Sequence, residues 1–172
     1  MILKGDIINI MDTMQGLKRT HYCGDVEGIG NEVVVGGYVQ KVRDLGNLIF
    51  IDLRDRTGIV QLAFDDSTDR NIFSKASGCH AEYVLMAKGV VRERESKNDT
   101  IKTGHIEIDV KDLRILAKAQ TPPFEIVDDT NVNEELRLKY RYLDLRRNVL
   151  QENLIMRSKI AKVARDYYYE NG

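Results

Sequence analysis

Tryptophan is absent from the sequence, and only two prolines, two cysteines and three histidines occur among its 172 residues. Cys23 and Cys79 lack the spacing of a metal site or a disulfide framework, so we expect no metal and a reducing, cytoplasmic location. No apolar run approaches the roughly 20 residues of a membrane span, and the N-terminus lacks the layout of a signal peptide. Because the net charge is −1, any contact with nucleic acid must use local patches rather than the overall field.

The stretch RDLGNLIFIDLRDRTGIVQ, residues 43–61, contains the clearest structural signal. Two turn signals within it each precede an apolar segment, which predicts strands over 48–53 and 59–64. Alternate side chains of a strand point to opposite faces, so Phe50 is expected on the face away from Ile51 and the core. The pattern alone leaves a second possibility equally open, in which Phe50 is a core residue of a twisted sheet.

The turns also set an expected register. A two-residue loop after the first strand places Gln61 on the face of Phe50, and a four-residue loop before it places Arg43 opposite Leu48 and Lys41 opposite Phe50. That face then presents two cations, one aromatic ring and one amide. The combination suits single-stranded nucleic acid, because cations attract phosphate, a ring stacks on a base and an amide hydrogen-bonds to a base edge. A slip of one residue would move all of these side chains to the other face.

The order of the predicted elements is strand, strand, strand, helix, strand, strand. The strands are expected over 32–43, 48–53, 59–64, 81–94 and 104–116, and the short helix over about 69–77 after a turn and cap at 65–68. This is the order of an OB-fold, a mainly β, five-stranded Greek-key barrel that binds oligonucleotides across its second and third strands. Gly89 is expected to form a bulge in the fourth strand.

The chain is expected to have four parts: an extension at 1–18, an OB-fold domain at 19–117, a linker at 118–133 and helices at 134–172. Pro122-Pro123 marks the linker. Asn133 and Asn148 are predicted to cap two helices, the first running over 134–146. A short helix is possible in the extension because four apolar residues there have helical spacing: Ile7, Ile10, Met11 and Met14. A disordered leader is equally open.

Two motifs closely resemble bacterial-type aspartyl-tRNA synthetase, a class II enzyme: the stretch 43–61 and LRLKYRYLDLRR at 136–147. RTHYCG at 19–24 is similar to that family's usual start, and TGHIEID at 103–109 to its last barrel strand. The resemblance implies an N-terminal OB-fold domain that binds the tRNA anticodon. It also implies a full-length homodimeric ligase that uses ATP and Mg²⁺ to join aspartate to tRNA. Because the family's catalytic motifs are expected beyond 172, we expect this chain to bind tRNA weakly, to have no catalytic residue and to need no cofactor.

The resemblance also implies roles for individual residues. Phe50 would stack on an anticodon base, while Gln61 and Glu107 would hydrogen-bond to base edges. Other positions would contact the anticodon loop or its phosphates: Arg43 with Leu45, Arg92 and Asn98. The resemblance implies no role for Lys41. We expect it to contact RNA only because the predicted register places it on the same face as Phe50. Glu107 is expected to point outward from the fifth strand.

Two other functions remain open. One is a free-standing OB-fold protein that binds single-stranded nucleic acid without sequence preference, although such a protein has no need of the linker or of the motif at 136–147. The other is a pure oligomerisation module, in which replacing Phe50 would leave RNA affinity unchanged.

Overall fold

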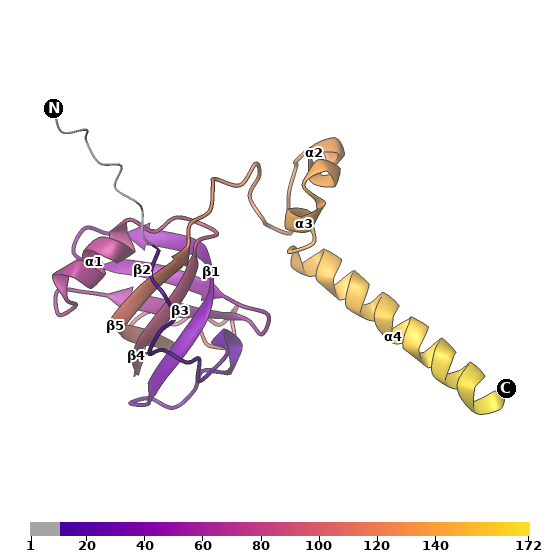
Figure 1. Cartoon of the computed structure of the whole chain (residues 1–172), viewed down its shortest axis with the longest axis horizontal. Helices are drawn as coiled ribbons and strands as arrows, with labels where there is room; N and C mark the ends of the chain where they lie inside the picture. Colours follow the sequence, from indigo (N-terminus) through magenta and orange to yellow (C-terminus); the bar gives the residue numbers. More distant parts are fainter. Residues whose placement is uncertain (1–10) are drawn as a thin grey trace. The chain divides into compact units, whose positions relative to one another are not determined.

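The computed structural model describes residues 11–172, which divide into two compact units (Figure 1). One unit ends at Pro122 and the other spans Pro123–Gly172. The division lies inside the predicted linker, and the predicted domain bounds themselves stay predictions.

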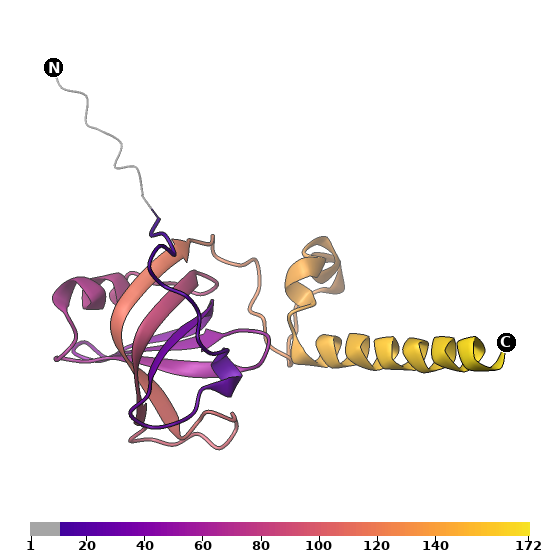
Figure 2. The same cartoon turned by 60° about the horizontal axis from the view of Figure 1, so that its bottom comes forward.

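The first unit is a barrel that closes in the order β1-β2-β3-β5-β4 (Figures 1 and 2). Its elements are a 3-10 turn at Cys23–Asp25, β1 at Glu32–Asp44, β2 at Ile49–Arg54, β3 at Ile59–Phe64, α1 at Arg70–Ser77, β4 at Val84–Glu93 and β5 at Ile106–Ala117. Neighbouring strands are antiparallel except β3 and β5, which are parallel. The predicted OB-fold is therefore confirmed.

Alternation along β2 separates the core from the outer face. Ile49, Ile51 and Leu53 are fully buried, whereas Phe50 and Asp52 are half-buried. The predicted pairing of β2 with β3 is confirmed in full. Burying one such aliphatic side chain is worth about 1.5–3 kcal/mol, and a slip of one residue would expose all three, so the core fixes this register.

The first hairpin differs from the prediction. Phe50 pairs with Arg43 rather than with Lys41, and the Leu45 N–H donates to the Leu48 carbonyl across 2.9 Å. The loop therefore has two residues, Gly46 and Asn47, instead of four. A slip of two residues preserves the face, so Lys41 and Arg43 still share a face with Phe50. The register shift between Val39 and Lys41 marks a bulge in β1.

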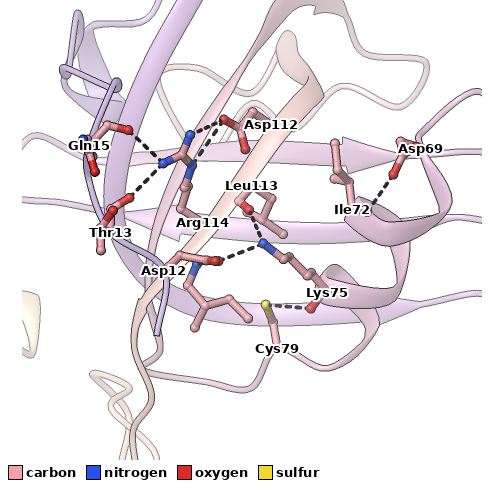
Figure 3. A network of polar contacts seen from close by, with 11 residues as sticks. Asp12, Thr13, Gln15, Asp69, Ile72, Lys75, Cys79, Asp112, Leu113 and Arg114 are labelled. Carbon is pink, nitrogen blue, oxygen red and sulfur yellow. Dashed lines mark hydrogen bonds and ion pairs between the residues drawn. The ribbon is translucent and has the colours of Figure 1, made fainter. Parts of the chain in front are cut away.

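α1 begins one residue after Asp69, whose side chain accepts hydrogen bonds from the N–H groups of Asn71 and Ile72 (Figure 3). The turn at 65–68 was expected to supply this cap, and that prediction is wrong. The bulge at Gly89 is confirmed by a register shift against β5. A Cβ at Gly89 would lie 2.2 Å from the Asp109 carbonyl oxygen, so this close approach requires glycine.

The segment before the barrel packs on β5 without forming a helix in its described part (Figure 3). Asp12 exchanges two hydrogen bonds with the backbone of Ile115, and its carboxylate lies 2.9 Å from the Lys75 ammonium. The Arg114 guanidinium donates to the carbonyls of Thr13 and Gln15. The helix that the spacing left possible is therefore absent from 11–18, while its earlier positions, Ile7 and Ile10, lie outside the described residues.

The second unit contains α2 at Glu134–Lys139, α3 at Arg141–Asp144 and α4 at Asn148–Asn171. Asn133 caps α2 as predicted, but the single helix expected over 134–146 is divided at Tyr140, whose φ and ψ of −110° and 46° are not helical. Asn148 is the first residue of α4 and not its cap, which contradicts the prediction.

The Asp144 carboxylate is fully buried between the guanidinium groups of Arg141 and Arg147, which fixes the turn between α3 and α4. Among the described residues no helix combines the length and hydrophobicity that crossing a membrane requires.

Candidate nucleic-acid interface

Polar side chains from all five strands form one hydrogen-bonded chain on the outer face of the barrel. We call these residues the outer polar row: Arg43 of β1, Asp52 of β2, Gln61 of β3, Glu107 of β5 and Arg92 of β4. The strand register produces this arrangement. Asp52 pairs with Gln61, Gln61 with Glu107 and Glu107 with Arg92, so each side chain emerges beside the next.

The centre of the row is a buried amide–carboxylate pair. The Gln61 Nε2 atom donates to Glu107 Oε2 across 2.7 Å, and the two residues are only 3% and 5% exposed. Glu107 points away from the core, as predicted, and it is nevertheless buried because Gln61 and Arg92 contact it. A buried hydrogen bond in this setting fixes the amide orientation, with Nε2 toward the carboxylate.

Arg92 closes one end of the row. Its Nε donates to Glu107 Oε1 across 2.8 Å, and its Nη1 donates to Asp65 Oδ2 across 2.9 Å. Burial alone would lower the pKa of the Arg92 guanidinium, but its hydrogen bonds with Asp65 and Glu107 outweigh burial and raise it. The Asp65 carboxyl has a pKa lowered to about 2, first because of its hydrogen bond from Ser67 and then, against the opposing effect of burial, because of Arg92.

Arg43 closes the other end, beside Phe50. Its Nη2 donates to Gln61 Oε1 across 2.7 Å and to Asp52 Oδ1 across 3.1 Å, and its Cζ lies 5.4 Å from the centroid of the Phe50 ring. Phe50 is half-buried and is not among the residues that form the core. Of the two possibilities that the sequence left open, the structure therefore supports a ring on the outer face.

The three remaining predicted residues lie outside the hydrogen-bonded row. Lys41 is exposed on β1 and pairs with Asp52 in the register. Leu45 is 69% exposed in the first hairpin. Asn98 lies in the loop between β4 and β5, where its Oδ1 accepts from the backbone N–H and the hydroxyl of Thr100. Asn98 thus shapes its own loop.

Two members of the site were missed from the sequence. Asp52 lies on the face predicted for Phe50 and Gln61, but the predicted register set Arg43 opposite Leu48, too far along the strand to indicate the ion pair. Asp65 was interpreted only as part of a turn, and no local pattern links it to Arg92, which lies 27 positions later.

Metal chemistry finds no support in the described part of the chain. No group of three or more histidine, cysteine, aspartate or glutamate side chains within 11–172 is placed to hold an ion. Cys23 and Cys79 are free and buried, and burial raises the pKa of both thiols, that of Cys79 to about 11.

A closed barrel of this topology, with an aromatic ring beside a row of cations, amide and carboxylates, defines the class of OB-fold nucleic-acid-binding domains. Residues 33–116 match the family model described as an OB-fold nucleic acid binding domain. Residues 133–172 match the model of class II tRNA synthetases (D, K and N). The chain belongs to the aspartate–tRNA ligase family of these synthetases.

Curated relatives cover most of this chain. It is 52% identical over 165 residues to the aspartate–tRNA(Asp/Asn) ligase of Thermoanaerobacter pseudethanolicus, with 94% of this chain and 28% of the relative covered. The same identity and coverage hold for the aspartate–tRNA ligase of Ruminiclostridium cellulolyticum. The chain thus spans a little over a quarter of their length. Among solved structures, the asparaginyl-tRNA synthetase of Pyrococcus horikoshii aligns with a TM-score of 0.73 at 26% identity, covering 90% of this chain and 36% of that one.

Proposed function

We propose that the barrel recognises the anticodon loop of an aspartate-accepting tRNA, as the anticodon-binding domain of an aspartate–tRNA ligase. The main support is the grouping of Phe50, Gln61 and Glu107 on one outer face of an OB-fold barrel, in a chain whose relatives are aspartate–tRNA ligases.

The centre of the outer polar row would recognise bases. Phe50 would stack on one base, a contact worth about 1–3 kcal/mol. Gln61 Nε2 keeps a second N–H beyond its bond to Glu107. Glu107 Oε2 accepts from Gln61 and Oε1 from Arg92, so each oxygen keeps a further lone pair for a base that donates. Each good base-edge contact discriminates against a wrong base by about 1–3 kcal/mol.

The ends of the row would hold the RNA backbone. Lys41 and Arg43 flank the Phe50 ring on β1, and the Arg92 side chain is 36% exposed beside Glu107. Leu45 would contact the loop from the exposed hairpin. Asn98 uses its side-chain oxygen within its own loop, so its NH₂ group would be the part that contacts RNA.

We further propose that the longer protein is a cytoplasmic homodimer that joins aspartate to tRNA with ATP and Mg²⁺, and that this chemistry lies outside the length spanned here. The two cysteines without disulfides are consistent with a reducing compartment. The exposed apolar stripe of α4 would then be covered within the whole protein: Met156, Ile160, Val163 and Tyr167.

The test is equilibrium binding at fixed salt to two stem-loop RNAs of equal length and charge, one with the anticodon GUC and one with a scrambled loop. We expect at least a tenfold preference for the first, equivalent to one good base contact. Equal affinity would instead favour an OB-fold protein that binds single-stranded nucleic acid without preference. ATP–pyrophosphate exchange by this chain alone would contradict the proposal that the catalytic chemistry lies outside its length.

A further inference from the structure

The guanidinium of Arg43 occupies the place that the proposed function gives to a nucleobase. It lies over the Phe50 ring, and its Nη2 donates to Gln61 Oε1, the oxygen that would otherwise accept from a base edge. A guanidinium is planar and has N–H donors along its edge, as a nucleobase has. One side chain therefore makes both the stacking contact and the edge contact that the proposed function assigns to a base.

We propose that Arg43 is an internal occupant of the base position in the RNA-free protein, and that Asp52 is the positioning residue that holds it there. This inference rests on the proposed function. On binding, one base displaces the guanidinium from Phe50 and Gln61, and Arg43 turns to a phosphate of the RNA. Asp52 thereby sets how often the position is open.

The burial of the row determines which of its members moves. Gln61 and Glu107 are almost fully buried, and Glu107 is held by Arg92, so the centre of the row stays in place. The Arg43 side chain is 39% exposed and that of Asp52 24% exposed, and ion pairs this close to solvent are weak.

Arg43 also has an unmet donor in this position. Its Nε is buried and has no hydrogen-bond partner in the described structure. A buried donor without a partner is unfavourable, whereas a phosphate can accept from two guanidinium nitrogens at once. Leaving the base position for a phosphate therefore improves the hydrogen bonding of Arg43.

Asp52 is not left without a cation when Arg43 moves. Lys41 lies directly opposite Asp52 in the pairing of β1 with β2, and its side chain is exposed. Its flexible ammonium can approach the carboxylate that Arg43 releases. The exchange gives Lys41 a role in addition to its contact with RNA.

When Arg43 occupies the base position, RNA cannot use it. The apparent affinity for RNA is therefore the intrinsic affinity multiplied by the fraction of molecules in which the position is open. Asp52→Asn weakens the hold on Arg43, and we expect it to raise the affinity for the GUC stem-loop about three- to fivefold. The matched control is Asp44→Asn. It removes the same charge from the same hairpin and keeps a side-chain oxygen for the Gly46 N–H.

A set of stem-loops, each with one abasic anticodon position, distinguishes two causes of tighter binding. One is displacement of Arg43 by a base, and the other is the loss of a negative charge near the RNA. With the intact loop, we expect Asp52→Asn to bind more tightly than Asp44→Asn. This difference in affinity should disappear for the one RNA that lacks the displacing base. Equal gains for both variants on every RNA, or weaker binding by Asp52→Asn, would overturn the proposal. If the wild-type chain fails to prefer the GUC loop at all, the proposed function itself has failed.

A second measurement needs no variant. In ¹H–¹⁵N spectra of the wild-type chain, the Arg43 Nε–H signal should shift on saturation with the intact stem-loop, because the group leaves the Phe50 ring. An unchanged signal at saturation would overturn the displacement of Arg43 even if RNA is bound.

Discussion

Replacing Glu107 by glutamine tests the centre of the outer polar row. The carboxylate accepts from Gln61 Nε2 across 2.7 Å and from Arg92 Nε across 2.8 Å. An amide has one acceptor oxygen, so its NH₂ group must face one of these two donors. The variant therefore loses one hydrogen bond to a carboxylate and leaves one donor without a partner.

The cost follows from the burial of each group. A hydrogen bond to a charged group is worth about 1.5–3 kcal/mol, and Glu107 is 5% exposed, so most of this value applies. Arg92 is partly solvated and keeps Asp65 as a second acceptor, which limits its own loss. We expect Glu107→Gln to lower the free energy of unfolding by about 2 kcal/mol and to weaken binding of the GUC stem-loop.

The assay is urea denaturation followed by circular dichroism at neutral pH, combined with RNA binding below the transition. Glu93→Gln is the control, because Glu93 is an exposed carboxylate of the same sheet whose ion pair is with the exposed Lys97. We expect no measurable change in its denaturation midpoint. Wild-type stability of Glu107→Gln would refute the reasoning, since it would mean that the amide satisfies both donors.

Two further predictions follow from carboxylates at other positions. Because the pKa of Asp65 falls from 3.8 to about 2 on folding, its stabilising effect is present well above pH 3.8 and is lost as the pH falls through 3.8 to about 2. Acid titration of Asp65→Asn should therefore show less loss of stability over this range than wild type, and parallel curves would contradict it. Asp12→Ala should speed amide exchange of Ile115, whose N–H donates to the Asp12 carboxylate; unchanged exchange would show that the segment at 11–15 does not protect β5.

Local patterns identified most of the barrel, because alternation and turn residues are local. The β2–β3 register followed from Asp55-Arg56-Thr57-Gly58, whereas the β1–β2 register was wrong by two residues. The segment Asp44 to Asn47 fits both a two-residue and a four-residue loop. The bulge between Val39 and Lys41 leaves no mark in the sequence either.

Burial and partners across the barrel could not be predicted in this way. Glu107 alternates with core residues and was expected only to point outward, but closure brings β5 beside β3 and covers it with Gln61, 46 positions away. Asp65 became the partner of Arg92 for the same reason. The division at Tyr140 was also missed, because the sequence around it favours a continuous helix.

The most direct test of the central claim is the loss of anticodon preference when the Phe50 ring is removed. Phe50→Ala and Phe50→Leu should both fold and should both reduce the affinity for the GUC stem-loop by about 1–3 kcal/mol relative to wild type, while binding to the scrambled loop changes less. The leucine variant keeps apolar bulk but has no ring. Unchanged affinity for the GUC loop in both variants would contradict recognition of the anticodon by this face and would favour an oligomerisation module.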